Sequence, residues 1–431
     1  MSAQDSWGDL EYSRKLETFD SNSDAAAFAA GPAGEVEGIC LPGELTDHGR
    51  ATTRQLGERL RHLYVDQLKF MPAVLENDGL KTSTSALRPY LSFYGFYPPT
   101  SRAPGLLTPK IITRTPSDET LYPNEGACRR FAQLSHAFAQ RTADRWNESE
   151  DMAYLNKLIG KWMPEGSNQV KVDGHPRLSG IMDTINSTLA HGEETKLPKE
   201  FYDPRGRDIV DRIGVEEWYS GYKESAEYRA LGIGGLIGDV VARMVDRARF
   251  EMGSSKPASG TQDVRFALSG CHDTTLAAVL SSMGAFENEK WPPYTSHIAI
   301  ELFQDRSASS SSSSPATTVS GGTTSWWTSI FGPAKNIVTP PASSRQPFTD
   351  LSEAQKKTLD GYYVRLRYND RVMTVPGCKP TGKHYGDDES LCTLEAFKQV
   401  ADKFTPKNWK QACNANLGAN AFPEKVEPAG V

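Results

Sequence analysis

The residues best suited to chemistry in this sequence are His272 and Asp273, which follow a short apolar run at residues 264–268. The run is typical of a β-strand, and the small residues after it indicate a turn. A helix is predicted to begin near Thr274, so unpaired backbone N–H groups and the positive end of a helix dipole would lie beside the pair. Asp273 is a suitable capping acid for that helix. We therefore predict a site for an anion such as phosphate at this strand-turn-helix.

Regular elements on either side of the motif would hold it in place. The helix that begins near Thr274 has apolar residues at helical spacing, and Gly284 is placed to end it. Asn369-Asp370 predicts a hairpin turn between two further strands. Helices are expected at residues 131–146 and 236–248, and strands at residues 111–114, 298–303, 362–368 and 372–375.

A second group of motifs gives the chain a family resemblance. In sequence order they are Gly43-Glu44-Leu45-Thr46, the helical segment 56–61, Leu121-Tyr122-Pro123-Asn124 with Cys128, Trp291-Pro292-Pro293, Glu301-Leu302, Val375-Pro376-Gly377-Cys378, Leu391-Cys392, and Trp409 with Cys413. Together with His272-Asp273 they resemble the histidine acid phosphatases, branch 2 of the histidine phosphatase superfamily. Within that family the chain looks most similar to the lysophosphatidic-acid phosphatase type and its fungal relatives.

The resemblance implies a fold and a reaction. The fold is α/β and phosphoglycerate-mutase-like, with a mainly parallel sheet, helices on both faces and an inserted helical cap. In the family a histidine attacks the phosphorus of a phosphomonoester, arginines and a second histidine hold the phosphoryl oxygens, and an aspartic acid protonates the leaving alcohol. His272 would be the second histidine and Asp273 the proton donor. The reaction needs no cofactor and no metal.

The family's first signature, Arg-His-Gly-x-Arg-x-Pro, is absent from this sequence. That motif supplies the nucleophilic histidine. Asp47-His48-Gly49-Arg50 lies at the start of a predicted helix instead of after a strand, so His48 is predicted to be a helix-surface residue. A truncated gene model and a protein without turnover would each account for the missing motif, and both alternatives stay open.

Three further residues are candidates for binding the substrate. Lys81 and Arg88 lie where family members carry phosphate-binding arginines. A lysine is a point charge without the bidentate fork of a guanidinium, so Lys81 would hold phosphate more weakly than an arginine. His191 precedes Leu197-Pro198 as in a pocket loop of the family, although an exposed loop histidine is the plainer interpretation.

Composition shifts along the chain predict its domain organisation. Residues 1–35 are rich in Ser, Asp, Ala and Gly and are predicted to be a disordered lead. Residues 36–150 and 233–431 are predicted to form the α/β core, and residues 151–232 a helical cap subdomain. The Ser- and Pro-rich residues 305–350 are predicted to be a disordered insertion that carries Trp326-Trp327.

The overall composition excludes several classes of function. The chain has 431 residues, 38% of them hydrophobic, and a net charge of −6, with no basic face that would indicate a nucleic-acid partner. No run approaches the ~20 apolar residues of a transmembrane segment. The 8 histidines are scattered without the spacing of metal ligands. A cytoplasmic or mitochondrial location is favoured, while secretion and the oligomeric state stay open.

Cysteines and glycines suggest two other chemistries, neither of which is favoured. Cys271 beside His272 resembles a cysteine nucleophile, but neighbouring side chains at the end of a strand point in different directions. The glycine-rich segment 232–238 lacks the preceding strand of a dinucleotide-binding loop. In secreted relatives the positions of Cys128 and Cys413, and of Cys378 and Cys392, form bridges; four reduced thiols are the alternative.

Three hypotheses about function follow. The first is an acid phosphatase acting on small or lysolipid phosphomonoesters, including lysophosphatidate. The second is a pseudophosphatase or phosphate-binding protein that keeps the fold without turnover. The third is an interaction protein that acts through the Trp-bearing insertion at residues 305–350.

Overall fold

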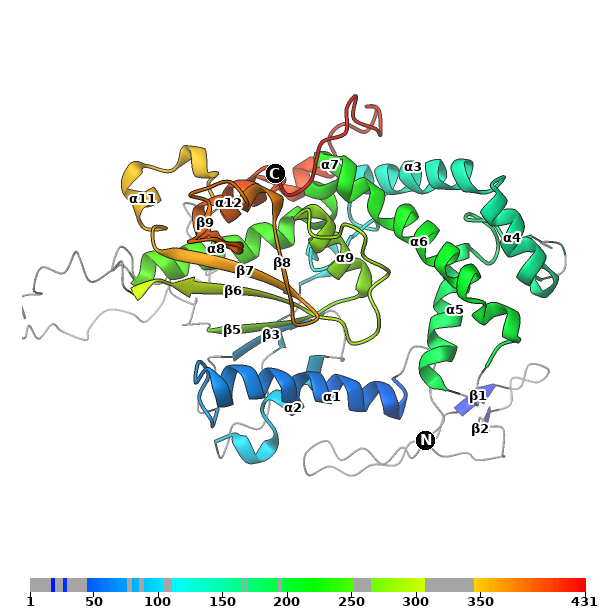
Figure 1. Ribbon diagram of the computed structural model, residues 1–431, viewed down its shortest axis with the longest axis horizontal. Coiled ribbons are helices and arrows are strands. Elements are labelled where there is room, and N and C mark those ends of the chain that lie inside the picture. Colours follow the sequence, from blue (N-terminus) through cyan, green and yellow to red (C-terminus); the bar gives the residue numbers. More distant parts are fainter. Residues whose placement is uncertain are drawn as a thin grey trace, which may run out of the picture. The chain divides into compact units, whose positions relative to one another are not determined.

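The computed structural model of the chain (Figure 1) describes residues 17–19, 26–28, 45–75, 80–84, 89–103, 111–112, 114–164, 166, 169–192, 196–251, 265–306 and 345–431. The chain divides into two compact units. The first joins Met1–Ile112, Ile185–Leu197 and Arg265–Gly270, and the second joins Thr113–Thr184, Pro198–Val264 and Cys271–Val431.

Two predicted segments lie mostly outside the described residues. Of the predicted lead at residues 1–35, the described parts are β1 (Glu17–Phe19) and β2 (Ala26–Phe28), which pair antiparallel. Of the predicted insertion at residues 305–350, residues 307–344 lie outside the described part, including Trp326-Trp327. The hypothesis of an interaction protein rests on that insertion and stays a prediction.

Three strands of the first unit form a parallel sheet. They are β3 (Leu80–Thr84), β4 (Ile111–Ile112) and β5 (Phe266–Gly270), in the order β4-β3-β5. Thr84 pairs with Gly270, so the carboxyl ends of β3 and β5 lie side by side. Strands are present at both predicted places: β4 covers only Ile111–Ile112 of the predicted residues 111–114, and β5 is shifted two residues from the predicted 264–268 toward the turn.

Helices complete the first unit. They are α1 (Asp47–Arg61), the π-helical turn η1 (His62–Gln67) and α2 (Pro89–Phe96). The backbones of α1 and α2 approach so closely that a Cβ on Gly57 would lie 1.9 Å from the carbonyl oxygen of Ser92. Glycine is therefore required at that crossing. His48 is exposed on α1, as predicted.

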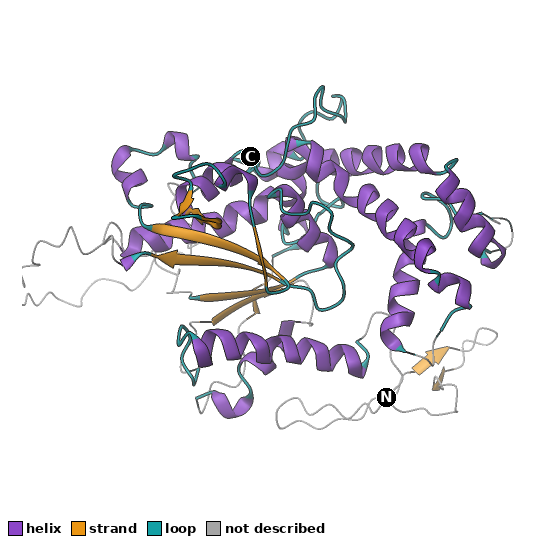
Figure 2. Ribbon diagram, viewed as in Figure 1, coloured by secondary structure: helices purple, strands orange, loops and turns teal. Residues whose placement is uncertain are grey.

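The second unit contains a five-stranded sheet (Figure 2). Its strands are β6 (Ile298–Gln304), β7 (Tyr362–Tyr368), β8 (Arg371–Met373), β9 (His384–Tyr385) and β10 (Asp388–Thr393), in the order β6-β7-β10-β9 with β8 beside β7. Every pair in this sheet is antiparallel. The mainly parallel sheet expected from the sequence is thus not confirmed, since among the described strands only those of the first unit pair in parallel.

The predicted hairpin accounts for part of this difference. Asn369 and Asp370 have φ angles of 47° and 67° and join β7 to β8. A two-residue turn with two positive φ angles connects strands that run in opposite directions. The apolar periodicity of a strand does not reveal whether its neighbour runs parallel or antiparallel to it. The hairpin turn was therefore the one local feature of the sequence that indicated antiparallel pairing.

Helices make up most of the second unit. They are α3 (Arg129–Trp146), α4 (Glu150–Ile159), α5 (Leu178–His191, of which residues 185–191 belong to the first unit), α6 (Pro204–Glu224), α7 (Ala226–Arg229), α8 (Gly235–Glu251), α9 (Asp273–Ser282), α11 (Glu353–Lys357), α12 (Leu394–Asp402) and α13 (Trp409–Ala412). Its short 3-10 turns are η3 (Pro116–Asp118), η4 (Gly160–Trp162), η6 (Lys199–Tyr202), η9 (Phe348–Asp350) and η10 (Pro376–Cys378), while η2 (Pro99–Ser101) belongs to the first unit.

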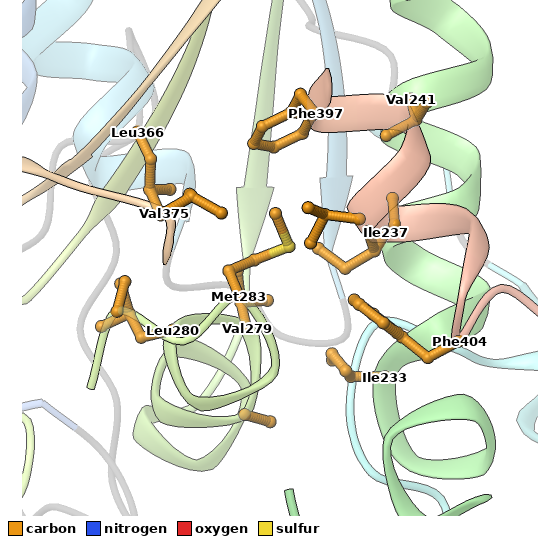
Figure 3. Close-up of a cluster of buried hydrophobic side chains, with 14 of the residues drawn as sticks. Ile233, Ile237, Val241, Val279, Leu280, Met283, Leu366, Val375, Phe397 and Phe404 are labelled. Atoms are coloured by element: carbon orange, nitrogen blue, oxygen red, sulfur yellow. The ribbon is translucent and has the colours of Figure 1, made fainter. Parts of the chain in front are cut away.

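The core of the second unit lies where α8, α9 and α12 meet the sheet (Figure 3). Ile237 of α8, Met283 after α9, Phe397 of α12 and Leu366 of β7 belong to one buried cluster. Gly284 follows with a φ of +68°, the left-handed conformation that ends a helix, as predicted. The beginning of α9 is therefore held against a packed core.

The glycine-rich segment before α8 is helical. It forms the π-helical turn η7 (Ala230–Gly234), and a Cβ on Gly234 would lie 2.1 Å from the carbonyl oxygen of Phe404. The glycine permits this close backbone contact. The segment follows α7 (Ala226–Arg229) directly, so the strand that precedes a dinucleotide-binding loop is not found before it.

Two disulfides cross-link the second unit, one between distant segments and one within a short loop. Cys128 bonds Cys413 and Cys378 bonds Cys392, with Cα–Cα distances of 4.6 Å and 5.3 Å. These are the pairings that the family resemblance implied, in preference to four reduced thiols. In the part of the chain that the structure describes, no helix is long and apolar enough to cross a membrane.

Candidate active site

The predicted strand-turn-helix is present around His272. β5 ends at Gly270 and α9 begins at Asp273, with Cys271 and His272 between them. His272 is the N-cap residue, with φ of −95° and ψ of 166°, and its carbonyl accepts the backbone N–H of Thr275 at 3.1 Å. Its side chain is exposed and makes no capping hydrogen bond. The imidazole is therefore not used to cap the helix.

The expected cap differs by one residue. Asp273 was predicted to cap the helix, but it is the first helical residue, and its Oδ1 accepts the N–H of the adjacent Thr274 at 2.8 Å. The carboxylate still lies in the first turn, where the helix dipole favours negative charge. The difference arises because the small residues of the turn do not specify, to better than one position, the residue at which the helix begins.

A tryptophan from outside the motif holds the carboxyl group of Asp273. The indole Nε1 of Trp291 donates to Asp273 Oδ2 at 2.7 Å. The backbone N–H of Trp291 donates to Asp211 Oδ1 on α6 at 3.0 Å, and its ring lies 5.0 Å from that of Tyr219. Both oxygens of Asp273 are thus engaged, and its orientation depends on α6, which packs against α9 (Figure 1).

The acids near Asp273 have raised pKa values. Although the Asp183 side chain is exposed, desolvation by surrounding atoms raises its pKa, and the negative charge of Asp273 adds to the effect. Burial also raises the pKa of Asp211, opposed by the hydrogen bond from Trp291. Desolvation thus disfavours the ionised forms of Asp183 and Asp211, which raises the pKa of both carboxyl groups.

Tyr219 is the most buried member of this group. It is 1% exposed, and its hydroxyl oxygen has no hydrogen-bond partner among the described residues. Burial raises its pKa well above 10, and the charges of Asp273 and Asp183 raise it further. The hydroxyl therefore stays protonated at physiological pH and can act only as a neutral donor or acceptor.

Cys271 is excluded as a nucleophile. Burial raises the pKa of its thiol to about 12, and the charge of Asp273 contributes to the rise. Because the thiolate is the reactive form, a thiol with this pKa is unreactive near neutral pH. The raised pKa agrees with the sequence-based judgement against Cys271, which stays a prediction.

The structure describes the three predicted substrate-binding residues only in part. Lys81 lies in β3 and its backbone pairs with Ala267 of β5, but its side chain lies outside the described residues, as does all of Arg88. His191 is the exposed last residue of α5. The parallel register brings the end of β3 beside the end of β5, the edge at which α/β folds bind ligands. The roles of Lys81, Arg88 and His191 stay predictions.

The sequence did not identify the residues that surround Asp273. Trp291-Pro292-Pro293 was noted only as a family landmark, and Asp183, Asp211 and Tyr219 had no assigned role. They belong to α5, α6 and the segment after α9, which come together only in the folded chain. Local periodicity carries no information about such contacts.

Comparisons with known proteins place the whole chain in a family. The family model of the histidine phosphatase superfamily (branch 2) matches residues 3–319. The chain is 34% identical over 413 residues to a protein of Schizosaccharomyces pombe described as a probable acid phosphatase, covering 94% of this chain and 83% of that protein. It is 24% identical over 276 residues to human lysophosphatidic acid phosphatase type 6, covering 62% of this chain and 59% of that protein. The fold is similar to that of Hafnia alvei phytase in complex with tartrate, with a TM-score of 0.51, 10% identity and coverage of 87% and 90%.

Proposed function

Because the chain belongs to branch 2 of the histidine phosphatase superfamily, an acid phosphatase-like family of hydrolases, we propose that it hydrolyses phosphomonoesters at the site formed by His272 and Asp273. The observation that carries this proposal is the arrangement of Asp273 at the first turn of α9. Its carboxyl group is held by Trp291 and lies among other acids. The two hydrogen bonds fix the orientation of this carboxyl group beside His272, as proton delivery to a leaving group requires.

In the proposed reaction His272 binds a phosphoryl oxygen beside the N-terminus of α9. A nucleophile attacks the phosphorus, the bond to the ester oxygen breaks, and Asp273 gives its proton to the departing alkoxide. Water then attacks the phosphorylated nucleophile and releases phosphate, while Asp273 takes up the proton of that water. Fixed donors at the helix N-terminus would stabilise the charge that develops on the phosphoryl oxygens.

The identity of the nucleophile separates two versions of the function. The sequence contains no Arg-His-Gly motif. This absence favours a second candidate, a phosphate-binding pseudophosphatase that keeps the His272 site without turnover. A small-molecule phosphomonoester is the proposed ligand in both cases. Lysophosphatidate is one candidate, because one relative is named for its phosphatase activity on that lipid.

Hydrolysis by this chain at acidic pH tests the proposal. An aryl phosphate and lysophosphatidate are offered to the wild type, to His272→Ala and to His48→Ala, which removes an exposed histidine of α1. We expect His272→Ala to lower kcat/KM by about 100-fold or more, and His48→Ala to leave it unchanged. Equal thermal unfolding midpoints establish that the variants are folded.

Two other outcomes have definite meanings. If the folded wild type shows no turnover but binds orthovanadate, and His272→Ala loses that binding, the pseudophosphatase is correct. If turnover is present and His272→Ala retains it, the assignment of the site is wrong.

A further inference from the structure

The leaving alcohol of the proposed hydrolysis must come close to Asp273, because that residue gives it a proton. The side chains beside Asp273 are therefore those that the alcohol meets. Trp291 is the first of them, since its indole Nε1 donates to Asp273 Oδ2 at 2.7 Å. The groups around Trp291 thus bear on which substrates the site accepts.

Trp218 is an exposed aromatic residue at this place. Its ring is perpendicular to that of Trp291, and the two ring centroids are 6.1 Å apart. The side chain of Trp218 is 38% exposed, whereas that of Tyr219, the next residue of α6, is 1% exposed. An exposed indole beside the ring that holds the proton donor can contact a bound substrate.

Helix packing brings α5 to the same place. A Cβ on Gly214 of α6 would lie 3.2 Å from the sulfur of Met182 on α5 and 3.9 Å from the ring of Trp291. Asp183 follows Met182, and its carboxyl group is close enough to Asp273 for the two negative charges to repel each other. Asp183 is exposed and makes no hydrogen bond or ion pair with any residue that the structure describes. A carboxylate without a cation therefore lies near the proton donor.

Cations of the same region have acidic partners of their own. Lys290 precedes Trp291, and its Nζ lies 3.1 Å from a carboxylate oxygen of Asp208. Arg177, one residue before α5, pairs with the buried Glu217 of α6. These pairs engage the two cations with other acids, so the charge of Asp183 is left for a ligand.

An exposed indole together with an unpaired carboxylate suits a cationic ligand. An ammonium group is attracted to the face of an aromatic ring, most strongly to that of tryptophan, and proteins bind quaternary ammonium ligands in this way. The carboxylate of Asp183 adds an opposite charge. An uncharged alcohol, such as that of lysophosphatidate, would not be attracted by either group in this way.

We propose that the His272 site acts on phosphomonoesters whose alcohol carries an ammonium group, and that Trp218 and Asp183 bind that group. The inference rests on the proposed hydrolysis and leaves its chemistry unchanged. The bond between phosphorus and the ester oxygen breaks, the alkoxide takes the proton of Asp273, and the amino alcohol leaves. Phosphocholine represents this class of substrate. Its neutral isostere, in which a tert-butyl group replaces the trimethylammonium group, has the same shape without the positive charge.

The ratio of kcat/KM for phosphocholine to kcat/KM for its neutral isostere tests the proposal. We expect the wild type to favour phosphocholine about tenfold. Trp218→Leu, which keeps an apolar side chain, and Asp183→Asn should each lower this ratio about threefold. Trp162→Leu in η4 and Asp144→Asn in α3 are matched controls at exposed positions and should leave the ratio unchanged. Equal thermal unfolding midpoints establish that the variants are folded.

A second pair of compounds separates this inference from the proposed hydrolysis. It consists of the phosphonates of the two esters, in which a methylene group replaces the ester oxygen, so that neither can be hydrolysed at that position. If the folded chain hydrolyses neither ester, the proposed hydrolysis is wrong. Tighter calorimetric binding of the cationic phosphonate, weakened in Trp218→Leu, would then still support the ammonium site.

Three results would overturn the inference alone. The first is hydrolysis of the charged and the neutral ester with equal kcat/KM. The second is a preference for phosphocholine that neither Trp218→Leu nor Asp183→Asn lowers. The third, in a chain without turnover, is equal affinity for the two phosphonates or no binding of either.

Discussion

At the scale of single residues, the contact between Trp291 and Asp273 connects the proposed chemistry to the fold. Asp273 accepts one hydrogen bond from its own helix and one from the indole of Trp291. Trp291 is in turn held by Asp211 and packed on Tyr219. A proton donor works only when its acidic oxygen faces the leaving group, so Trp291 is proposed as a positioning residue.

Trp291→Phe tests this positioning role. The substitution removes the indole N–H donor and keeps an aromatic ring beside Tyr219. We expect kcat for an aryl phosphate to fall about tenfold with little change in KM, because the hydrogen bond that orients the carboxyl group of Asp273 is lost while substrate binding is not. Trp162→Phe, at an exposed position, is the control. A parallel rise in KM, or an equal loss in both variants, would contradict the role.

Asp211 gives a prediction about pH and stability. Because burial raises its pKa in the folded protein, the folded state binds its proton more tightly than the unfolded chain does. The free energy of unfolding therefore falls as pH rises from the unfolded value of about 3.9 through the raised folded value. The variant Asp211→Asn has no ionisable carboxyl group at this position, so its free energy of unfolding does not fall with pH for this reason. Its amide oxygen can still accept the N–H of Trp291.

The expected result is a variant more stable than the wild type at pH 7 and equal to it at pH 3. Urea unfolding at both pH values measures this difference. Asp208→Asn on the same helix, whose carboxylate pairs with Lys290 at an exposed site, should not show the gain. A stability difference between Asp211→Asn and the wild type that is the same at both pH values would show that the effect is not one of ionisation.

At the scale of elements, the crossing of α1 and α2 depends on a glycine. The carbonyl oxygen of Ser92 occupies the space that a Cβ of Gly57 would need, at 1.9 Å. Neither backbone can move without disturbing the buried residues Leu56 and Phe96 around the contact. Helix propensity alone would favour alanine over glycine, so packing overrides propensity here.

Gly57→Ala and Gly49→Ala separate these two effects. Both glycines lie in α1, but a Cβ on Gly49 would meet its nearest neighbour at 3.4 Å, which is tolerable. We expect Gly57→Ala to lower the free energy of unfolding by about 1–3 kcal/mol or more through overpacking. Gly49→Ala should change it by less than about 1 kcal/mol and in the stabilising direction. Thermal unfolding of the two variants measures the contrast, and similar midpoints would contradict the close crossing.

At the scale of the whole molecule, the C-terminal segment is tied to helices far earlier in the chain. Cys413 is bonded to Cys128 across a sequence separation of 285 residues. The buried guanidinium of Arg130 binds Glu227 and the carbonyl oxygens of Ala419 and Asn420. The segment therefore forms part of the second unit's structure.

The two disulfides should differ in their contribution to stability. A cross-link stabilises a protein by restricting its unfolded state, and the effect grows with the length of the closed loop. Replacing Cys128 and Cys413 by alanine should cost about 5–6 kcal/mol, against about 3 kcal/mol for Cys378 and Cys392, whose separation is 14 residues. Urea unfolding of both double variants measures the order. A larger loss for the shorter loop would show that native-state effects dominate.

The local elements could be predicted from the sequence because their signals are local. The strand and helix around His272, the hairpin at Asn369-Asp370 and the helix end at Gly284 depend on side chains within a few residues of one another. The disulfide pairings followed from the family resemblance. The antiparallel pairing of the five-stranded sheet could not be predicted in this way. The alternation of buried residues in β7 is the same beside a parallel or an antiparallel neighbour.

By itself, the sequence determined that this chain belongs with the histidine phosphatases, that His272 and Asp273 stand at the start of a helix, and which cysteines could be joined. Only the tertiary structure decided what surrounds Asp273 and which charged side chains of α3 and α6 pair. Trp291, Asp211 and Tyr219 come together at Asp273 through helix packing, and Arg145 of α3 pairs with Glu216 of α6. Such contacts depend on how amphipathic faces are buried against one another, and a linear pattern of residues does not specify that choice.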